Sequence, residues 1–307
     1  MKSGKWEIGS ERWEAGTGKM HGKPIGRSSA IRGSVFLSLP TAHLQPLLHW
    51  LVVAALAAFC LLPILWGVRT SVAPEFDSSL LPSGLTGEHY ARILARGLFY
   101  RYAINSAVVT LGAVILVLPL ALAAGYALGR QEFWGRRLAP VMLALPLLPA
   151  VAFLVPIARY LNVLGLYNTR TALVLANAAF CLPFATWMVW NFVHAIPPSL
   201  EEAAFLDGCS RLEALVRVVL PSMIPGAIAA GVFVAVQAWS NYLFAYALSS
   251  DSELRVLPKA IVDFVGSWRT DWGGLMAIGV LTLLPPLLLF QILQRWFVAG
   301  MYGLTDH

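Results

Sequence analysis

The sequence contains few charged residues: 12% of its 307 residues are Asp, Glu, Lys or Arg, whereas 58% are apolar. Soluble domains carry about 25% charged residues, so this chain has too little polar surface for a soluble globular protein. Its hydrophobicity also excludes disorder over most of its length. The formal charge of +6 comes from scattered basic residues, which favours charge at a membrane surface over a nucleic-acid-binding patch.

The chain also has few cysteines and lacks the common phosphate-binding motif of ATPases. The three cysteines, Cys60, Cys181 and Cys209, lie far apart in the chain. Their spacing suggests neither a disulfide framework nor a metal site. The chain has no Gly-x-x-x-x-Gly-Lys-Ser/Thr sequence, so we expect that it does not bind or hydrolyse ATP itself. We expect no cofactor, no metal and no nucleic acid partner.

Long stretches without Asp, Glu, Lys or Arg are the main feature of the sequence. A helix needs about 20 apolar residues to cross a bilayer, and lipid leaves a backbone with no outside hydrogen-bond partner. We therefore expect an all-α integral membrane protein with one transmembrane domain over residues 46–303. The expected six spans lie near 47–68, 104–128, 138–158, 171–193, 225–248 and 273–294.

The two ends of the chain should lie on the same side, because the number of spans is even. More Lys and Arg fall inside than outside when both termini are cytoplasmic. Residues 1–45 are polar and of mixed charge, which predicts a cytoplasmic tail and not a signal peptide. The longest exterior loop, 69–102, should contain a short helix over 88–98.

The loop at 196–221 contains two serine–glutamate pairs with the spacing of a capping box, in which each side chain bonds the other residue's backbone N–H. The pairs are Ser199 with Glu202 and Ser210 with Glu213. They predict two short helices, the first beginning at Leu200. Gly208 is suited to end the first helix in a left-handed conformation, and Pro221 should limit the second.

The first of these helices combines small and acidic side chains, which are Glu201, Glu202, Ala203, Ala204 and Asp207. Small residues let another surface come close, and the acids suit a basic rim on that surface. We infer a helix that docks in a groove of a partner. The alternative is an amphipathic helix on the membrane, but anionic lipid repels an acidic helix without Lys or Arg.

The same loop resembles the EAA loop of ABC importer permeases. Glu202, Ala203 and Ala204 are followed by Gly208 and later by Leu220 and Pro221 at the spacing of that family. Val218 stands where the family has isoleucine, and Asp207 before the glycine resembles the sugar-transporting branch. The C-terminal stretch 294–300 resembles the maltose permease-like subfamily.

This resemblance implies the smaller permease of a carbohydrate importer in a bacterial or archaeal cytoplasmic membrane. It implies a second permease, two cytoplasmic ATPase subunits and an exterior solute-binding protein as partners, and a cytoplasmic coupling helix between spans four and five. Glycerol-3-phosphate or a polyol is an alternative solute. Many relatives have an acidic residue in span five where this chain reads Trp239, Ser240 and Asn241, so the solute does not transfer directly.

Four polar residues within the expected spans are candidates for the substrate pathway: Asn177, Gln237, Ser240 and Asn241. The alternative is that these amides join helices to one another. Gln237 and Asn241 are four residues apart and should share one helix face. We expect that face to line the pathway, with Trp239 turned towards lipid or a neighbouring helix.

Two other classes of membrane protein fit the sequence less well. A secondary carrier usually has ionisable groups within its spans, and the six stretches contain no Asp, Glu, Lys or Arg. A membrane-embedded lipid-modifying enzyme would need acids, histidines or arginines that converge at a membrane face, and the six histidines are scattered. We therefore expect a transport protein that is not an enzyme.

Overall fold

The computed structural model describes residues 44–302 except residues 76, 78, 96, 131 and 265–269. The expected tail before residue 44 lies outside the described residues. The regular elements described are all helices, which confirms the all-α class. The chain forms two units, residues 1–55 and 56–307. Helix α1 (Leu44–Val72) begins in the first unit, and the helices after it belong to the second.

Four of the described helices are long and apolar enough to cross a membrane. They are α1, α3 (Leu98–Gly129), α6 (Arg170–Ala195) and α13 (Trp272–Tyr302). These helices include the expected first, second, fourth and sixth spans. Two bent helix pairs bring the number to six if each pair counts as one span.

The expected third span is not one helix. It consists of α4 (Glu132–Ala144), a 3-10 turn η1 (Leu145–Leu147) and α5 (Ala150–Val163), with a bend of 94° between the two halves. Leu148 is extended, with ψ 137°, because a residue that precedes proline avoids helical geometry. Pro149 then begins α5 as its N-cap.

The expected fifth span, 225–248, is also wrong as a single helix. Helix α10 (Ile224–Ser240) ends before Asn241, whose φ of −77° and ψ of 85° are not helical. The Asn241 side chain then accepts a hydrogen bond from the Phe244 backbone N–H at 3.1 Å and caps α11 (Tyr242–Leu248). Asparagine is among the preferred N-cap residues, so this residue interrupts an otherwise apolar helix.

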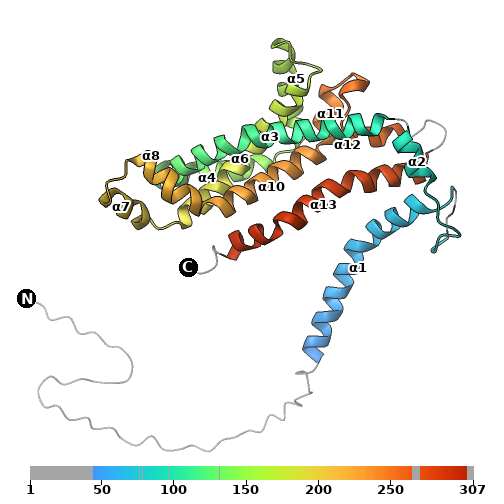
Figure 1. Cartoon of the computed structure of the whole chain (residues 1–307), viewed down its shortest axis with the longest axis horizontal. Helices are drawn as coiled ribbons and strands as arrows, with labels where there is room; N and C mark the ends of the chain where they lie inside the picture. Colours follow the sequence, from blue (N-terminus) through green and yellow to red (C-terminus); the bar gives the residue numbers. More distant parts are fainter. Residues whose placement is uncertain are drawn as a thin grey trace, which may run out of the picture. The chain divides into compact units, whose positions relative to one another are not determined.

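The core of the second unit lies where α3 packs along α6, with α10 beside both. Figure 1 shows these three helices running alongside one another. Gly125 and Gly129 let α3 approach α6 closely: a Cβ on Gly125 would lie 2.6 Å from Val189 Cγ1, and a Cβ on Gly129 would lie 2.5 Å from Val193 Cγ1. This Gly-x-x-x-Gly spacing is typical of close contact between membrane helices.

The end of the bundle that carries α2 (Glu88–Ala95) contains the expected exterior loop. Helix α2 contacts α13 and α3, and its Ile93 is buried. The short elements η3 (Ser252–Leu254), α12 (Leu257–Ala260) and η4 (Ile261–Phe264) complete the described secondary structure there. The short helix was expected over 88–98, and the structure ends it at Ala95.

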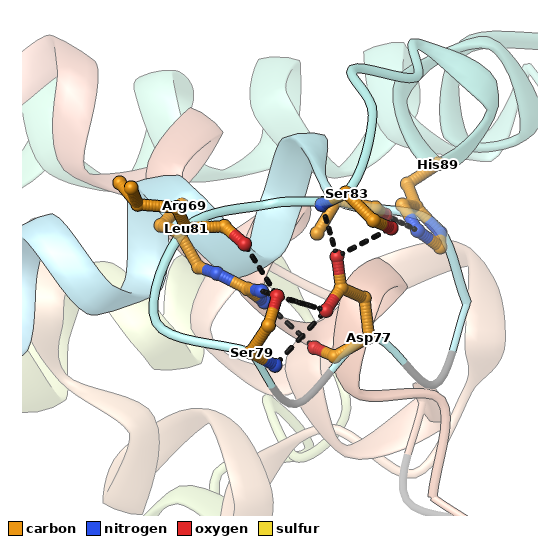
Figure 2. A network of polar contacts seen from close by, with 7 residues as sticks. Arg69, Asp77, Ser79, Leu81, Ser83 and His89 are labelled. Atoms are coloured by element: carbon orange, nitrogen blue, oxygen red, sulfur yellow. Dashed lines mark hydrogen bonds and ion pairs between the residues drawn. The ribbon is translucent and has the colours of Figure 1, made fainter.

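A carboxylate organises the loop before α2 (Figure 2). Asp77 Oδ1 pairs with Arg69 Nη2 at 3.0 Å and accepts a hydrogen bond from the Ser79 backbone N–H at 2.9 Å. Asp77 Oδ2 accepts one from the Ser83 backbone N–H at 2.6 Å. Hydrogen bonds from Ser79, first through its hydroxyl group, and from Ser83 hold the pKa of Asp77 well below its usual range.

Candidate functional site

Helix α7 (Ser199–Leu206) forms the first part of the 196–221 loop, at the opposite end of the bundle from α2. Its N-cap is Pro198, and no side chain caps it. The expected capping box of Ser199 and Glu202 is therefore wrong. The helical backbone of Pro198, with φ −59° and ψ −26°, makes Pro198 the N-cap and Ser199 the first residue of the helix, so Ser199 is not at the capping position.

The end of α7 has the expected left-handed glycine. Gly208 has φ 87°, and its N–H bonds the Phe205 carbonyl at 3.1 Å, while the Cys209 N–H bonds the Ala204 carbonyl at 3.0 Å. These bonds satisfy carbonyls that the helix leaves free. A Cβ built on Gly208 would meet nothing within 4 Å, so backbone geometry is the reason for glycine at this position.

The second expected capping box is confirmed. The Glu213 N–H bonds the Ser210 hydroxyl oxygen at 3.3 Å, and the Ser210 N–H bonds Glu213 Oε2 at 2.9 Å. Helix α8 (Arg211–Ala214) starts there and continues through a π-helical turn η2 (Leu215–Val219) into α9 (Leu220–Ser222). This run ends at Ser222, one residue after Pro221, and the chain then bends by 69° into α10, so the second helix ends close to the limit expected at Pro221.

The outward face of α7 combines acidic and apolar side chains. Glu202, Ala203 and Asp207 are exposed, Phe205 is 42% exposed, and Leu206 is 89% exposed. Ala204 is buried on the opposite side, which contacts η2. An exposed acidic and apolar helix face of this kind suits a groove with a basic rim.

Glu201 does not belong to that face, contrary to the expectation that it shares the acidic surface with Glu202. The residue is 8% exposed. Its Oε1 lies 2.6 Å from Arg130 Nε and 2.5 Å from Arg130 Nη2, and its Oε2 accepts a hydrogen bond from the Tyr126 hydroxyl at 3.1 Å. We call Tyr126, Arg130 and Glu201 the inner clamp.

Arg130 and Tyr126 are residues of this site that the sequence analysis missed. Arg130 is the C-cap of α3, directly after Gly129. The available signal was the Gly-x-x-x-Gly spacing of 125 and 129 followed by a basic residue at the end of a span. That spacing indicates close helix contact, but it does not reveal which acid the arginine reaches.

The polar residues expected on the substrate pathway lie in different environments. Asn177 is 2% exposed, and its Oδ1 accepts a hydrogen bond from Asn241 Nδ2 at 3.1 Å. This pair joins α6 to the break after α10, as the alternative interpretation holds. Gln237 is half-buried, and Ser240 is exposed.

The expected common helix face of Gln237 and Asn241 is wrong, because α10 ends at Ser240 and Asn241 is not helical. Trp239 contacts a neighbouring helix, as expected: its Nε1 donates a hydrogen bond to the Thr282 carbonyl of α13 at 2.9 Å. In the part of the chain that the structure describes, no three His, Cys, Asp or Glu residues are placed to hold a metal ion.

Comparison with known sequences identifies relatives over most of the chain. A family model described as "Binding-protein-dependent transport system inner membrane component" matches residues 117–302. A probable ABC transporter permease protein of Bacillus subtilis is 33% identical over 78% of this chain and 81% of its own length. A trehalose/maltose transport system permease protein of Thermococcus litoralis is 30% identical, over 80% and 91%. A diacetylchitobiose uptake system permease protein of Streptomyces coelicolor is 32% identical, over 82% and 94%.

Solved structures share the fold. A chain of a bacterial ABC transporter involved in the import of the acidic polysaccharide alginate matches with a TM-score of 0.71 at 22% identity, over 84% of this chain and 98% of that chain. A chain of the methionine transporter MetNI in an inward-facing conformation matches with a TM-score of 0.56 at 17% identity, over 67% and 98%.

Proposed function

We propose the following function. This chain belongs to the family of binding-protein-dependent transport system inner membrane components. It is a transmembrane permease subunit of an ABC importer and is not itself an enzyme. We propose that it forms half of the translocation pathway, together with a second permease, and that ATP hydrolysis in two cytoplasmic subunits drives it. An exterior solute-binding protein delivers the solute.

A sugar is the solute class that the relatives support. The Thermococcus litoralis relative is named for trehalose and maltose, and the Streptomyces coelicolor relative for diacetylchitobiose. Both names refer to disaccharides. A relative in Agrobacterium fabrum is named for sulfoquinovosyl glycerol, and glycerol-3-phosphate or a polyol is the second candidate. Exposed Ser240 and half-buried Gln237 are the pathway residues we propose, since neutral hydrogen-bonding groups suit a sugar.

The observation that carries the coupling role is the two-sided character of α7. Its outward face presents Glu202, Phe205 and Leu206, while Glu201 on its inward face binds α3 through Arg130. We propose that the outward face docks in a groove of the ATPase subunit. The loop 196–221 is then the coupling element, and it lies on the cytoplasmic side of the membrane.

The first experiment tests transport. The complete importer is purified, reconstituted in proteoliposomes and supplied with ATP and its cognate solute-binding protein. Calorimetry on that binding protein identifies the sugar, and the same sugar, radiolabelled, is used for uptake. We expect ATP-dependent uptake. A binding protein that takes only an amino acid, or uptake that is independent of ATP, contradicts the proposal.

A second experiment tests docking through Glu202. Its side chain has no hydrogen-bond or ion-pair partner among the described residues, so Glu202→Lys breaks no intramolecular contact that the structure shows. We expect normal membrane insertion but reduced ATPase co-purification and reduced uptake, because the substitution reverses the charge that faces a basic rim. Glu202→Gln, which removes the charge without reversing it, should lie between Glu202→Lys and the wild type. Full ATPase binding and normal uptake in Glu202→Lys would refute docking through this residue.

A further inference from the structure

We propose that the inner clamp carries the displacement of α7 into α3 and α6, so that these three helices move as one body during coupling. Arg130, Tyr126 and Glu201 are then positioning residues of the transport cycle. This inference rests on the proposed function, since it requires that α7 is displaced by an ATPase subunit. It concerns the face of α7 that the partner does not contact.

The carboxylate of Glu201 is held from two directions. Arg130 approaches Oε1 with two nitrogen atoms, at 2.6 Å for Nε and 2.5 Å for Nη2. The Tyr126 hydroxyl donates to Oε2 at 3.1 Å. Tyr126 lies in the last turn of α3 and Arg130 is its C-cap, so one side chain of α7 is fixed to a single end of one long helix.

The same guanidinium group also binds the end of α6. Arg130 Nη1 donates to the Val193 carbonyl at 3.3 Å and to the Ile196 carbonyl at 3.1 Å. Both carbonyls lie at the C-terminal end of α6, where the helix dipole attracts a cation, and the Val193 carbonyl also accepts the Ile196 N–H at 3.1 Å. One residue therefore joins α3, α6 and α7.

Close packing beneath the clamp leaves little room for independent movement. Gly129 precedes Arg130, and a Cβ on it would lie 2.5 Å from Val193 Cγ1. One turn earlier, a Cβ on Gly125 would lie 2.7 Å from Val189 Cβ. The contact between α3 and α6 is therefore made at backbone distance, and a close-packed interface transmits a displacement without absorbing it.

Burial makes the ion pair depend on both partners. The side chains of Arg130 and Glu201 are 19% and 10% exposed, so salt screens this pair less than a surface pair. The removal of one partner leaves an uncompensated charge in a buried position. An exposed pair elsewhere on α3 provides a comparison: Arg101 and Glu253 are 2.8 Å apart, with side chains 50% and 70% exposed.

Neighbouring positions on α7 therefore have different roles. Glu201 and Glu202 are about 100° apart around the helix axis, and the structure places the first inside and the second outside. The outward acid faces the partner, whereas the inward acid binds the bundle. Without the inward contact, α7 could follow the ATPase subunit without moving α3.

The test measures sugar transported per ATP hydrolysed by the complete importer in proteoliposomes. We expect Glu201→Gln and Arg130→Gln to retain their ATPase subunits and to hydrolyse ATP, while the transport ratio falls roughly tenfold, within the usual range of coupling between sites. Tyr126→Phe, which removes one hydrogen bond, should lower the ratio less. Glu253→Gln, which removes an exposed charge from the other pair of α3, should keep the wild-type ratio.

The double variant Arg130→Gln with Glu201→Gln separates this role from a general loss of stability. If the two residues act through each other, the double variant is no worse than either single variant, because their effects are not additive. Unchanged ratios in all three single variants of the clamp overturn the inference. So does a loss of uptake that only follows a loss of assembled ATPase subunits. If the wild type shows ATP-driven uptake and the clamp variants have the same ratio of sugar to ATP, only the role of the clamp is refuted. If the wild type shows no ATP-driven uptake, the proposed function itself is refuted.

Discussion

Substitution of Gly208 tests how strictly the end of α7 must be positioned. Its φ of 87° lies in the left-handed region, and a Cβ would meet nothing within 4 Å. A side chain at this position would therefore strain the backbone but would not collide with neighbouring residues. A Cβ in left-handed geometry costs about 1–2 kcal/mol, which corresponds to a roughly 5- to 30-fold shift in equilibrium against the native turn.

A series of variants separates this backbone effect from others. Asparagine visits the left-handed region more readily than other non-glycine residues, and β-branched valine is the least suited to it. We expect uptake per ATP hydrolysed to fall in the order Gly208→Asn, Gly208→Ala and Gly208→Val, with membrane insertion unchanged. Gly87→Ala is the matched control, because Gly87 also has open space around its Cβ position but no positive φ.

Two results would refute this reasoning. If Gly208→Asn were as damaging as Gly208→Val, the loss would not follow the preference for left-handed geometry. If Gly208→Val matched the wild type in uptake per ATP, the left-handed turn at the end of α7 would have no role in coupling. The same purified complexes, tested for bound ATPase subunits, show whether the variants lose docking or only the transmission of movement.

The remaining predictions concern the break in span five and the loop before α2. Asn241→Leu removes the cap of the Phe244 N–H and the hydrogen bond that Asn241 Nδ2 donates to Asn177 Oδ1. The lost cap alone is worth about 0.5–2 kcal/mol in stability, so we expect a lower melting temperature in detergent; a melting temperature equal to that of the wild type would contradict this. Asp77 has a lowered pKa, so its carboxylate contributes stability above about pH 4 that is lost only as the pH falls below this usual value. Hydrogen exchange in the loop should therefore show no loss of protection between pH 8 and pH 5, and Asp77→Asn should accelerate exchange throughout that range; a loss of protection near pH 6 would contradict this assignment.

The general architecture could be predicted because long uncharged stretches leave few alternatives in lipid. The left-handed conformation of Gly208 was also predictable, since it is the glycine that follows the short helix and glycine commonly ends helices in this conformation. The break at Pro149 was visible as a proline, but the surrounding apolar run favoured a continuous span. The spacing of Asn241 predicts a helical amide, whereas its side chain caps the next helix. Sequence spacing alone does not show whether such a side chain bonds the backbone in place of the helix.

The inner clamp could not be predicted, because its partners are far apart in the sequence. Glu201 and Glu202 are identical residues at neighbouring positions, so only the rotation of α7 decides which one faces inward. The expected start at Leu200 assumed that Ser199 is the N-cap, whereas Pro198 is the N-cap and the helix starts at Ser199. The contact between Arg130 and Glu201 depends in turn on the close approach of α3 and α6, which is a tertiary property.

Site-specific cross-linking from the outward face of α7 tests the central claim most directly. The three native cysteines are replaced, and Leu206→Cys, at a position 89% exposed, is labelled with a benzophenone maleimide in the complete importer. The control, Leu85→Cys, lies in the loop before α2 at a position 82% exposed. The account predicts that illumination joins the label at position 206 to the ATPase subunit and that the label at position 85 gives no such product. An ATPase adduct from position 85, or none from position 206, would contradict it.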